Sequence, residues 1–266
     1  MRTTGSLRSG ARWWLLLGLG LLALVVVACS PADEEDSLTV FAAASLRDVV
    51  TELEAAWAGE HPDVPLTIAT EASNVLAAQI SEGAPADVFI SADAVYPWRL
   101  SDAGLTAAEP TPFATNSLAL VAPLGDARVL DPSDLAQPGV RIVGISPGAP
   151  IARYTIEVIA GLADTMSEPQ AFAAAVDGNV VSHEDNVRAA LAKIELGEGD
   201  AAFVYTTDAR GSEDVRAIAL PESVDVTAEY TAVPVSERAL SAQFVRWLRE
   251  PTATAVIEAA GFEVGS

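Results

Sequence analysis

The chain has 266 residues, half apolar and a fifth charged, enough to bury a globular core in one large domain or two of ordinary size. Acidic residues number 37 against 15 lysines and arginines, a formal net charge of −22. This charge argues against nucleic-acid binding, which needs a basic surface to displace counterions from phosphates. One cysteine excludes an internal disulfide and a multi-cysteine metal site, two histidines offer little for a metal centre, and we expect no cofactor.

The amino terminus predicts an export signal. Three arginines precede an uncharged stretch at 13–28, which is shorter than the roughly 20 residues of a membrane-spanning helix. The stretch is followed by Cys29, and small residues before a cysteine resemble a bacterial lipobox, in which the thiol is acylated after cleavage. We expect a lipoprotein signal peptide at 1–28, a lipid-modified Cys29, an acidic tether over 29–37, and an extracytoplasmic mature chain of net charge −25. An uncleaved membrane anchor is the alternative reading.

Strands and helices alternate through the rest of the chain. The pattern predicts strands at 38–41, 64–70, 86–90, 118–121, 140–145, 201–205 and 217–220. It predicts a helix that carries Leu46 to Trp57 and ends at His61, and a short helix after Ser73 that carries Val75, Leu76 and Ile80. Further helices are predicted at 151–162, 168–176, 186–197, 236–249 and 252–260. Ser45, with Asp48 three residues later, has the spacing of a capping box. We therefore expect an α/β fold with parallel-rich sheets between helices, and any second domain inserted into the first.

Four segments place hydroxyls or open turns where a predicted strand ends and a helix begins: 42–45, 71–74, 146–151 and 184–187. Open α/β sheets bind ligands at this edge, and helix amino termini attract anions. Alternatively, Ser45, Ser73 and Asp185 only cap their helices. Among the tyrosines, Tyr205 is the favoured ligand-contacting phenol because it ends a predicted strand.

Residues 144–148 match the Gly-x-Ser-x-Gly elbow of serine hydrolases, with Ser146 as nucleophile and His183 as a possible base. In that elbow the residue after the serine donates its backbone N–H to the oxyanion hole. Here that residue is Pro147, which has no N–H. A secreted hydrolase using Ser146 therefore stays a distant alternative, and we expect a protein that is not an enzyme.

Two motifs resemble the extracytoplasmic molybdate-binding proteins of ABC transporters. They are VFAAASL at 40–46 and GAPADVFISAD at 83–93, with further matching blocks at 116–123, 184–188, 203–209 and 251–262. The resemblance covers 38–264 in order. It implies a type II periplasmic-binding-protein fold of two α/β lobes with a ligand cleft between them. Lobe 1 would hold 38–116 and 227–266, and lobe 2 would hold 117–226.

The resemblance also implies a function: capture of molybdate, and of tungstate, for delivery to the permease and ATPase of an ABC importer. The protein would be a monomer held at the membrane by its lipid, with no nucleic-acid partner. The implied oxyanion ligands are Ser45, Ser73, Ile151, Val187 and Tyr205, with no direct metal ligand. Many members have a serine-rich run around Ser73 and a small residue at the position of Ile151, and this chain departs from both patterns. A receptor for another oxyanion, such as sulfate or thiosulfate, is the nearest alternative.

Overall fold

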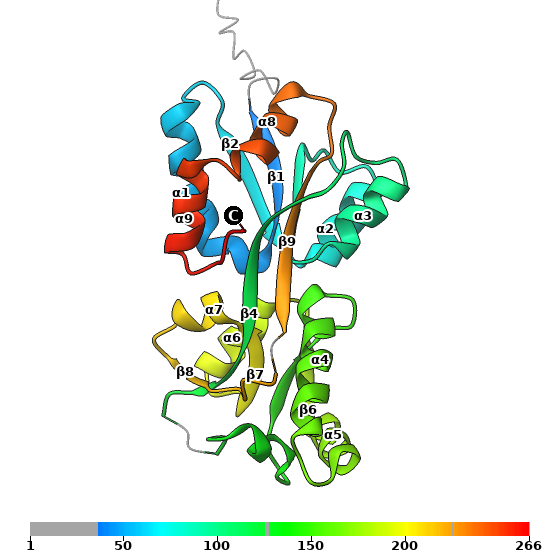
Figure 1. Ribbon diagram of the computed structural model, residues 1–266, viewed down its shortest axis with the longest axis vertical. Helices are drawn as coiled ribbons and strands as arrows, with labels where there is room; N and C mark the ends of the chain where they lie inside the picture. Colours follow the sequence, from blue (N-terminus) through cyan, green and yellow to red (C-terminus); the bar gives the residue numbers. More distant parts are fainter. Residues whose placement is uncertain (1–36, 126–127, 225, 266) are drawn as a thin grey trace, which may run out of the picture. The chain divides into compact units, whose positions relative to one another are not determined.

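The computed structural model describes residues 37–125, 128–224 and 226–265 (Figure 1). The predicted signal peptide, Cys29 and nearly all of the predicted tether lie outside these residues. Within the described ranges, no helix has the length and apolarity that a membrane crossing requires.

The described chain forms a nine-stranded sheet, in which eight strands follow the hydrogen-bonded path β2-β1-β3-β9-β4-β7-β5-β6 and β8 pairs with β4 off this path. Their bounds are β1 (Leu38–Ala43), β2 (Leu66–Glu71), β3 (Val88–Ser91), β4 (Thr111–Pro123), β5 (Ile142–Ile145), β6 (Val180–Glu184), β7 (Ala201–Tyr205), β8 (Val215–Ile218) and β9 (Thr227–Pro234). The strands predicted at 38–41, 201–205 and 217–220 agree with β1, β7 and β8 to within two residues.

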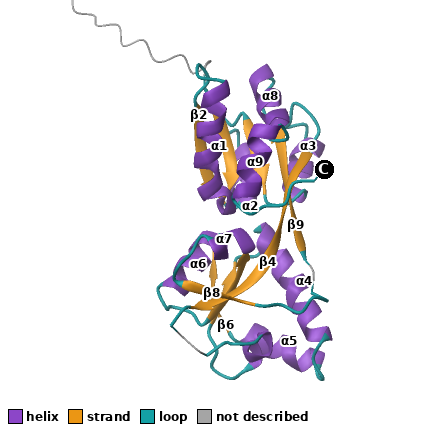
Figure 2. Ribbon diagram, turned by 60° about the vertical axis from the view of Figure 1, so that its left-hand side comes forward, coloured by secondary structure: helices purple, strands orange, loops and turns teal. Residues whose placement is uncertain are grey.

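Strand β4 belongs to both halves of this path. It pairs with β9 as far as Ser117, opposite Thr227, and then with β7 from Leu118, opposite Tyr205. We call the β1, β2 and β3 side lobe 1 and the β5 to β8 side lobe 2; Figure 2 shows β4 and β9 running between them. The predicted lobe boundaries, 116/117 and 226/227, fall at this change of partner and stay a prediction.

The expectation of parallel-rich sheets is only half right. In the described sheet, β1 pairs parallel with β2 and β3, and β5 pairs parallel with β6 and β7. The pairs made by β4 and β9 are all antiparallel. The reason is topological, because one of these strands carries the chain from lobe 1 to lobe 2 and the other returns it.

The helices cover both faces of the sheets. Their bounds are η1 (Ala44–Leu46), α1 (Arg47–Glu60), α2 (Ser73–Ser81), α3 (Val95–Asp102), η2 (Pro132–Ala136), α4 (Pro150–Asp164), α5 (Pro169–Gly178), α6 (Val187–Glu195), α7 (Thr206–Arg210), α8 (Ala239–Trp247) and α9 (Pro251–Ala259). Helix α1 buries Val49, Val50, Leu53 and Trp57, the residues at helical spacing, and ends at His61 as expected. Trp57 in turn packs edge-on against Trp247 at 5.2 Å, which fixes α1 in the core of lobe 1.

The capping expectations are wrong for all three residues named. Ser45 lies inside η1, and the N-cap of α1 is Leu46, with no side-chain capping bond. Ser73 is the first residue of α2 rather than its cap. Helix α6 is capped by Asn186, not Asp185, since the Asn186 side chain accepts a bond from the Ala189 N–H at 3.0 Å. The two serine hydroxyls are therefore available for other partners.

Candidate functional site

A small cavity lies where the starts of four helices meet between the lobes. Its volume is about 20 Å³, far below the roughly 300–1,000 Å³ of pockets for organic ligands. Lobe 1 lines it with residues at the starts of η1 and α2 and after β3, and lobe 2 with the starts of α4 and α6 and the end of β7. The lining residues are Ala43, Ala44, Ser45, Ala72, Ser73, Ala92, Ala149, Pro150, Ile151, Asn186, Val187 and Tyr205.

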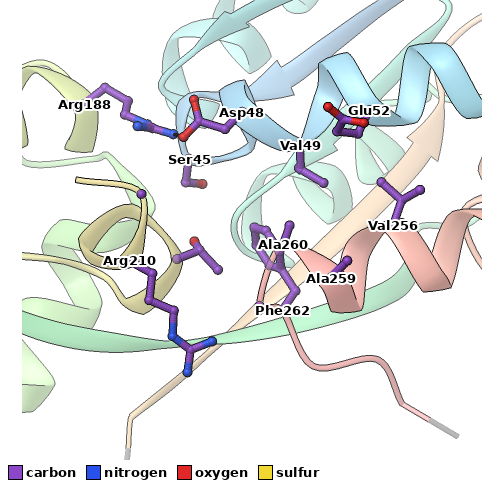
Figure 3. A pocket seen from close by; sticks show the side chains of 13 residues that line it. Ser45, Asp48, Val49, Glu52, Arg188, Arg210, Val256, Ala259, Ala260 and Phe262 are labelled. Carbon is purple, nitrogen blue, oxygen red and sulfur yellow. Dashed lines mark hydrogen bonds and ion pairs between the residues drawn. The ribbon is translucent and has the colours of Figure 1, made fainter. Parts of the chain in front are cut away.

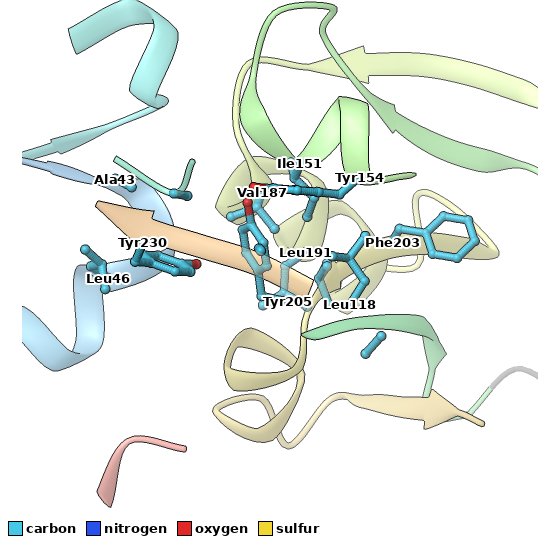
Figure 4. Packing of buried hydrophobic residues seen from close by; sticks show 14 of the residues in the cluster. Ala43, Leu46, Leu118, Ile151, Tyr154, Val187, Leu191, Phe203, Tyr205 and Tyr230 are labelled. Atoms are coloured by element: carbon cyan, nitrogen blue, oxygen red, sulfur yellow. The ribbon is translucent and has the colours of Figure 1, made fainter. Parts of the chain in front are cut away.

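All five residues that the sequence put forward as ligands are in this lining: Ser45, Ser73, Ile151, Val187 and Tyr205. Figure 4 shows Tyr205 beside Ile151 and Val187, with Ala43 and Leu46 of lobe 1 on the other side. The structure thus brings together segments that lie up to 160 positions apart in the chain. That these residues hold a ligand stays a proposal.

The cavity lining carries no charged side chain among the residues described. First-turn N–H groups of a helix have no acceptor within that helix, and its amino terminus carries a partial positive charge. Ser73, Ile151 and Val187 occupy such first-turn positions of α2, α4 and α6. The cavity therefore offers neutral hydrogen-bond donors from converging helices, a setting that suits an anion without a cationic side chain.

The phenol of Tyr205 adds a donor from the end of β7. Its side chain is 2% exposed, and its hydroxyl oxygen has no hydrogen-bond partner within the described part of the chain. Burial raises the pKa of Tyr205 well above its ordinary value, so the phenol keeps its proton. A buried hydroxyl without a partner costs about 1–3 kcal/mol, a penalty that an anion in the cavity would relieve by accepting the bond.

The hydroxyl of Ser73 is set up to donate. Its oxygen accepts a hydrogen bond from the Ala92 N–H at 3.1 Å, and the side chain is buried. A hydroxyl has one proton and two lone pairs. With a lone pair occupied by Ala92, the proton is left for a group in the cavity.

Ser45 is held by a residue that the sequence did not indicate. Its hydroxyl lies 2.7 Å from the hydroxyl of Tyr230, and both side chains are buried. Burial raises the pKa of Tyr230, so this phenol also stays protonated. Tyr230 lies on β9, 185 positions from Ser45, in a strand that the apolar pattern did not predict. No local signal in the sequence links the two residues.

The backbone donors of lobe 2 are fixed by their surroundings. Ile151 follows Pro150, the first residue of α4. Proline suits this position, because the first N–H groups of a helix have no partner within it and proline has no N–H. The Ile151 side chain is buried in the main apolar core, so the cavity accommodates a bulkier residue than many family members carry. Asn186, the cap of α6, also donates to the Glu71 carboxylate of lobe 1 at 2.5 Å.

Charged pairs surround the cavity and join the lobes. On one side, Arg153 of α4 pairs with Asp93 of lobe 1 at 3.0 Å, and Asp93 is fully buried. On the other side, Arg188 of α6 pairs with Asp48 of lobe 1 and lies 2.9 Å from the buried Asp208 of its own lobe. Arg153 and Arg188 thus each already have an acidic partner.

A second, larger cavity of about 550 Å³ lies between α1 and α9 of lobe 1 and α6 and α7 of lobe 2 (Figure 3). Ser45 lines both cavities. The larger one carries charges of both signs, Asp48 and Glu52 with Arg188 and Arg210, beside an apolar wall. It therefore lacks the uniform donor lining that distinguishes the smaller cavity.

The hydrolase elbow is not formed. Ser146 follows β5, but α4 begins only at Pro150, so the serine is not at a sharp turn from strand to helix. His183 lies on β6 opposite Gly144, and no hydrogen bond joins it to the Ser146 side chain in the described residues. Nor do these residues contain a group of three or more histidine, cysteine or acidic side chains suited to a metal ion.

Two lobes joined by two strands, with an uncharged donor cavity between them, define the fold and site of a solute-binding protein. The family model for bacterial extracellular solute-binding proteins matches residues 38–263, and the chain belongs to this family, in its molybdate-binding branch. The chain is 30% identical over 268 residues to the molybdate-binding protein ModA of Mycobacterium bovis, covering 94% of this chain and 98% of that one.

Solved structures share the fold. The periplasmic molybdate-binding protein of Azotobacter vinelandii superimposes with a TM-score of 0.72 at 24% identity, over 86% of this chain and 100% of that one. The sulfate-binding protein SubI of Mycobacterium tuberculosis gives a TM-score of 0.70 at 21% identity, over 85% and 86% of the two chains. Since one fold accommodates receptors for different solutes, the ligand must be argued from the cavity.

Proposed function

We propose that this protein captures molybdate, and also tungstate, outside the cytoplasmic membrane and delivers it to an ABC importer. The observation that carries the proposal is the small cavity lined by uncharged donors from both lobes. The relative of this chain in Mycobacterium bovis is named a molybdate-binding protein, and that name supports the same ligand here. The ligands would be the hydroxyls and N–H groups of Ser45 and Ser73, the N–H groups of Ile151 and Val187, and the phenol of Tyr205.

The chemistry of the ion fits these donors. Molybdate and tungstate are tetrahedral dianions that carry no proton near neutral pH, so every contact they seek is a donor. Hydrogen bonds to a charged group are worth about 1.5–3 kcal/mol each. A set of them outweighs the roughly 4–15 kcal/mol lost on immobilising a ligand. The acidic surface opposes binding at long range, but charges beyond about 8 Å are largely screened at physiological ionic strength.

The delivery step follows from the family and the amino terminus. Extracellular solute-binding proteins need a membrane partner that accepts the solute, which we propose to be the permease of an importer driven by its ATPase. Acylation of Cys29 would hold the protein, as a monomer, at the membrane surface near that permease. Mass spectrometry of the protein from its membrane fraction tests this, since a diacylglycerol-modified Cys29 is expected at the mature amino terminus.

Calorimetry tests the ligand. We expect molybdate and tungstate to bind with a 1:1 stoichiometry and sulfate, the other unprotonated tetrahedral dianion, to bind more weakly. Replacing Ser45→Ala together with Ser73→Ala should abolish molybdate binding and leave the fold intact, because two donors are lost from one ion. A control with Ser81→Ala and Ser101→Ala, helical serines outside the cavity lining, should bind as the wild type does. Unchanged affinity in the first double variant would defeat the site assignment.

A further inference from the structure

A hydrogen bond between two side chains joins the starts of two helices across the lobes. Glu71 ends β2 and lies two residues before Ser73 of α2, whereas Asn186 lies directly before Val187 of α6. The Asn186 amide donates from Nδ2 to Oε1 of Glu71 at 2.5 Å. The bond therefore connects, from opposite lobes, the two helix starts that carry the proposed ligands Ser73 and Val187.

Each partner of this bond is also fixed to the backbone of its own lobe. Oε1 of Glu71 accepts a second bond, from the Ala72 N–H at 2.8 Å. Oδ1 of Asn186 accepts a bond from the Ala189 N–H at 3.0 Å. These contacts decide the orientation of the amide, because its oxygen must face the N–H and its nitrogen must face the carboxylate. The result is a continuous path of hydrogen bonds from the backbone at the start of α2 to the backbone of α6.

The place of this pair separates it from the ionic contacts between the lobes. Asn186 lines the small cavity, whereas Arg153 and Arg188 are not among its lining residues. Glu71 puts a negative charge next to Ala72, which also lines the cavity, and that charge by itself opposes an anion. The charge of Glu71 thus gives no advantage in binding an anion, and its bond to Asn186 is the contribution that it can make.

We propose that Glu71 and Asn186 are positioning residues, which hold the starts of α2 and α6 at the separation that one oxyanion requires. Ion affinity then depends on the bond between them, because the donors of Ser73 and Val187 reach the same ion only while the two helix starts stay together. The inference rests on the proposed function and adds two residues whose side chains act on each other rather than on the ion.

The Asn186→Ser variant tests the bond by calorimetry with molybdate. Serine caps a helix about as well as asparagine, so the start of α6 is kept, but its short hydroxyl cannot replace the amide that donates to Glu71. We expect molybdate affinity to fall by about 5–10-fold, the net worth of about one hydrogen bond.

Asn179→Ser is the matched control, because the same substitution removes an amide donor whose partners all lie in lobe 2. Asn179 donates from Nδ2 to the backbone carbonyls of Leu135 and Gln137 at 2.8 and 2.9 Å. This variant should bind molybdate as the wild type does.

Reversing the pair supplies a rescue. In the double variant Glu71→Gln with Asn186→Asp, the aspartate still caps α6 and accepts a hydrogen bond that the glutamine amide now donates. This double variant and Asn186→Ser each keep one negative charge at the two positions, so a difference between them reports the bond and not the charge. We expect the double variant to bind molybdate within about twofold of the wild type, and so more tightly than Asn186→Ser.

The outcomes keep the two proposals apart. A wild-type protein that binds neither molybdate nor tungstate overturns the proposed function and this inference with it. If the wild type binds molybdate, but Asn186→Ser binds it equally well or the double variant binds it no better than Asn186→Ser, only the positioning role is overturned. A loss of affinity in Asn179→Ser as large as that in Asn186→Ser has the same consequence, because the effect then comes from the stability of lobe 2.

Discussion

Tyr205 is the residue at which the free-energy cost of burying an unpaired hydroxyl is most directly linked to binding of the ion. Its hydroxyl is buried without a partner in the described chain, and the proposed anion would supply that partner. We expect Tyr205→Phe to weaken molybdate binding by about 10–100-fold, the worth of one bond to a charged acceptor. The ligand-free variant should melt at the same or a higher temperature, because an unpaired polar atom has been removed.

Calorimetry and thermal unfolding of the same preparation measure both effects. The double variant Ser81→Ala with Ser101→Ala again serves as the control, because both serines are outside the cavity lining and their loss should not alter molybdate affinity. If Tyr205→Phe binds molybdate as the wild type does, the phenol is not a ligand.

For single residues, the sequence indicated those proposed to face the ion, but not the residues that hold these side chains in place. Ser45, Ser73 and Tyr205 stand at strand ends, where the expected topology concentrates ligands, and family resemblance added Ile151 and Val187. Tyr230 had no such mark, because its contact with Ser45 is created by tertiary packing of β9.

Among the helices and strands, those with a clear apolar pattern were predictable and those without one were not. The helix predicted at 151–162 corresponds to α4 (Pro150–Asp164), whereas the five-residue α7 and the Pro97-containing α3 escaped prediction. Strand β6 is only partly buried and so lacks a clear apolar pattern. The antiparallel pairing of β4 and β9 could not be read locally, because it depends on how the two lobes connect.

Helices α6 and α7 carry a buried acidic group whose titration should affect stability. Asp208 of α7 is fully buried, and burial raises its pKa from the usual 3.8 to about 7, although Arg188 of α6 lies 2.9 Å away and acts in the opposite direction. Asp48 and Arg47 of α1 also act on it. Between pH 3.8 and about pH 7, Asp208 therefore keeps a proton in the folded protein that it has lost in the unfolded chain.

It follows that Asp208 contributes stability at low pH that is lost as the pH rises through about 7. Each unit of raised pKa corresponds to about 1.4 kcal/mol. Asp208→Asn cannot ionise, so we expect its free energy of unfolding, relative to that of the wild type, to be larger at pH 8 than at pH 5. Urea unfolding of both proteins at the two pH values measures this difference. If the free energies of unfolding of the variant and the wild type differ by the same amount at pH 5 and pH 8, Asp208 does not titrate as described.

For the whole molecule, the cavity exists only while both lobes contribute to it. Ser45 and Ser73 come from lobe 1, and Ile151, Val187 and Tyr205 from lobe 2. Rotation about β4 and β9, the strands that join the lobes, would open the cavity to solvent and let the ion enter or leave. Contacts between lobes that involve no ligand should then determine how long the ion is retained.

The pair of Arg153 and Asp93 is the contact best placed to act in this way. Asp93 is fully buried in lobe 1, and Arg153 belongs to α4, two residues after Ile151. Because Arg153 is 42% exposed, its pair is worth less than the about 3–5 kcal/mol of a fully buried one. We expect Arg153→Gln to destabilise the closed arrangement by about 1 kcal/mol and to speed molybdate release by about fivefold.

Arg141→Gln provides a matched control, because Arg141 is 45% exposed and pairs at 2.7 Å with the buried Asp200, but both residues lie in lobe 2. This variant should lose thermal stability while releasing molybdate at the wild-type rate. Stopped-flow competition with excess tungstate measures the release rates of the three proteins. If Arg153→Gln and Arg141→Gln release the ion equally fast, the pair between the lobes stabilises the fold and not the closed state. A faster rate in Arg153→Gln alone would assign ion retention to a contact about half a helical turn from the proposed ligand Ile151.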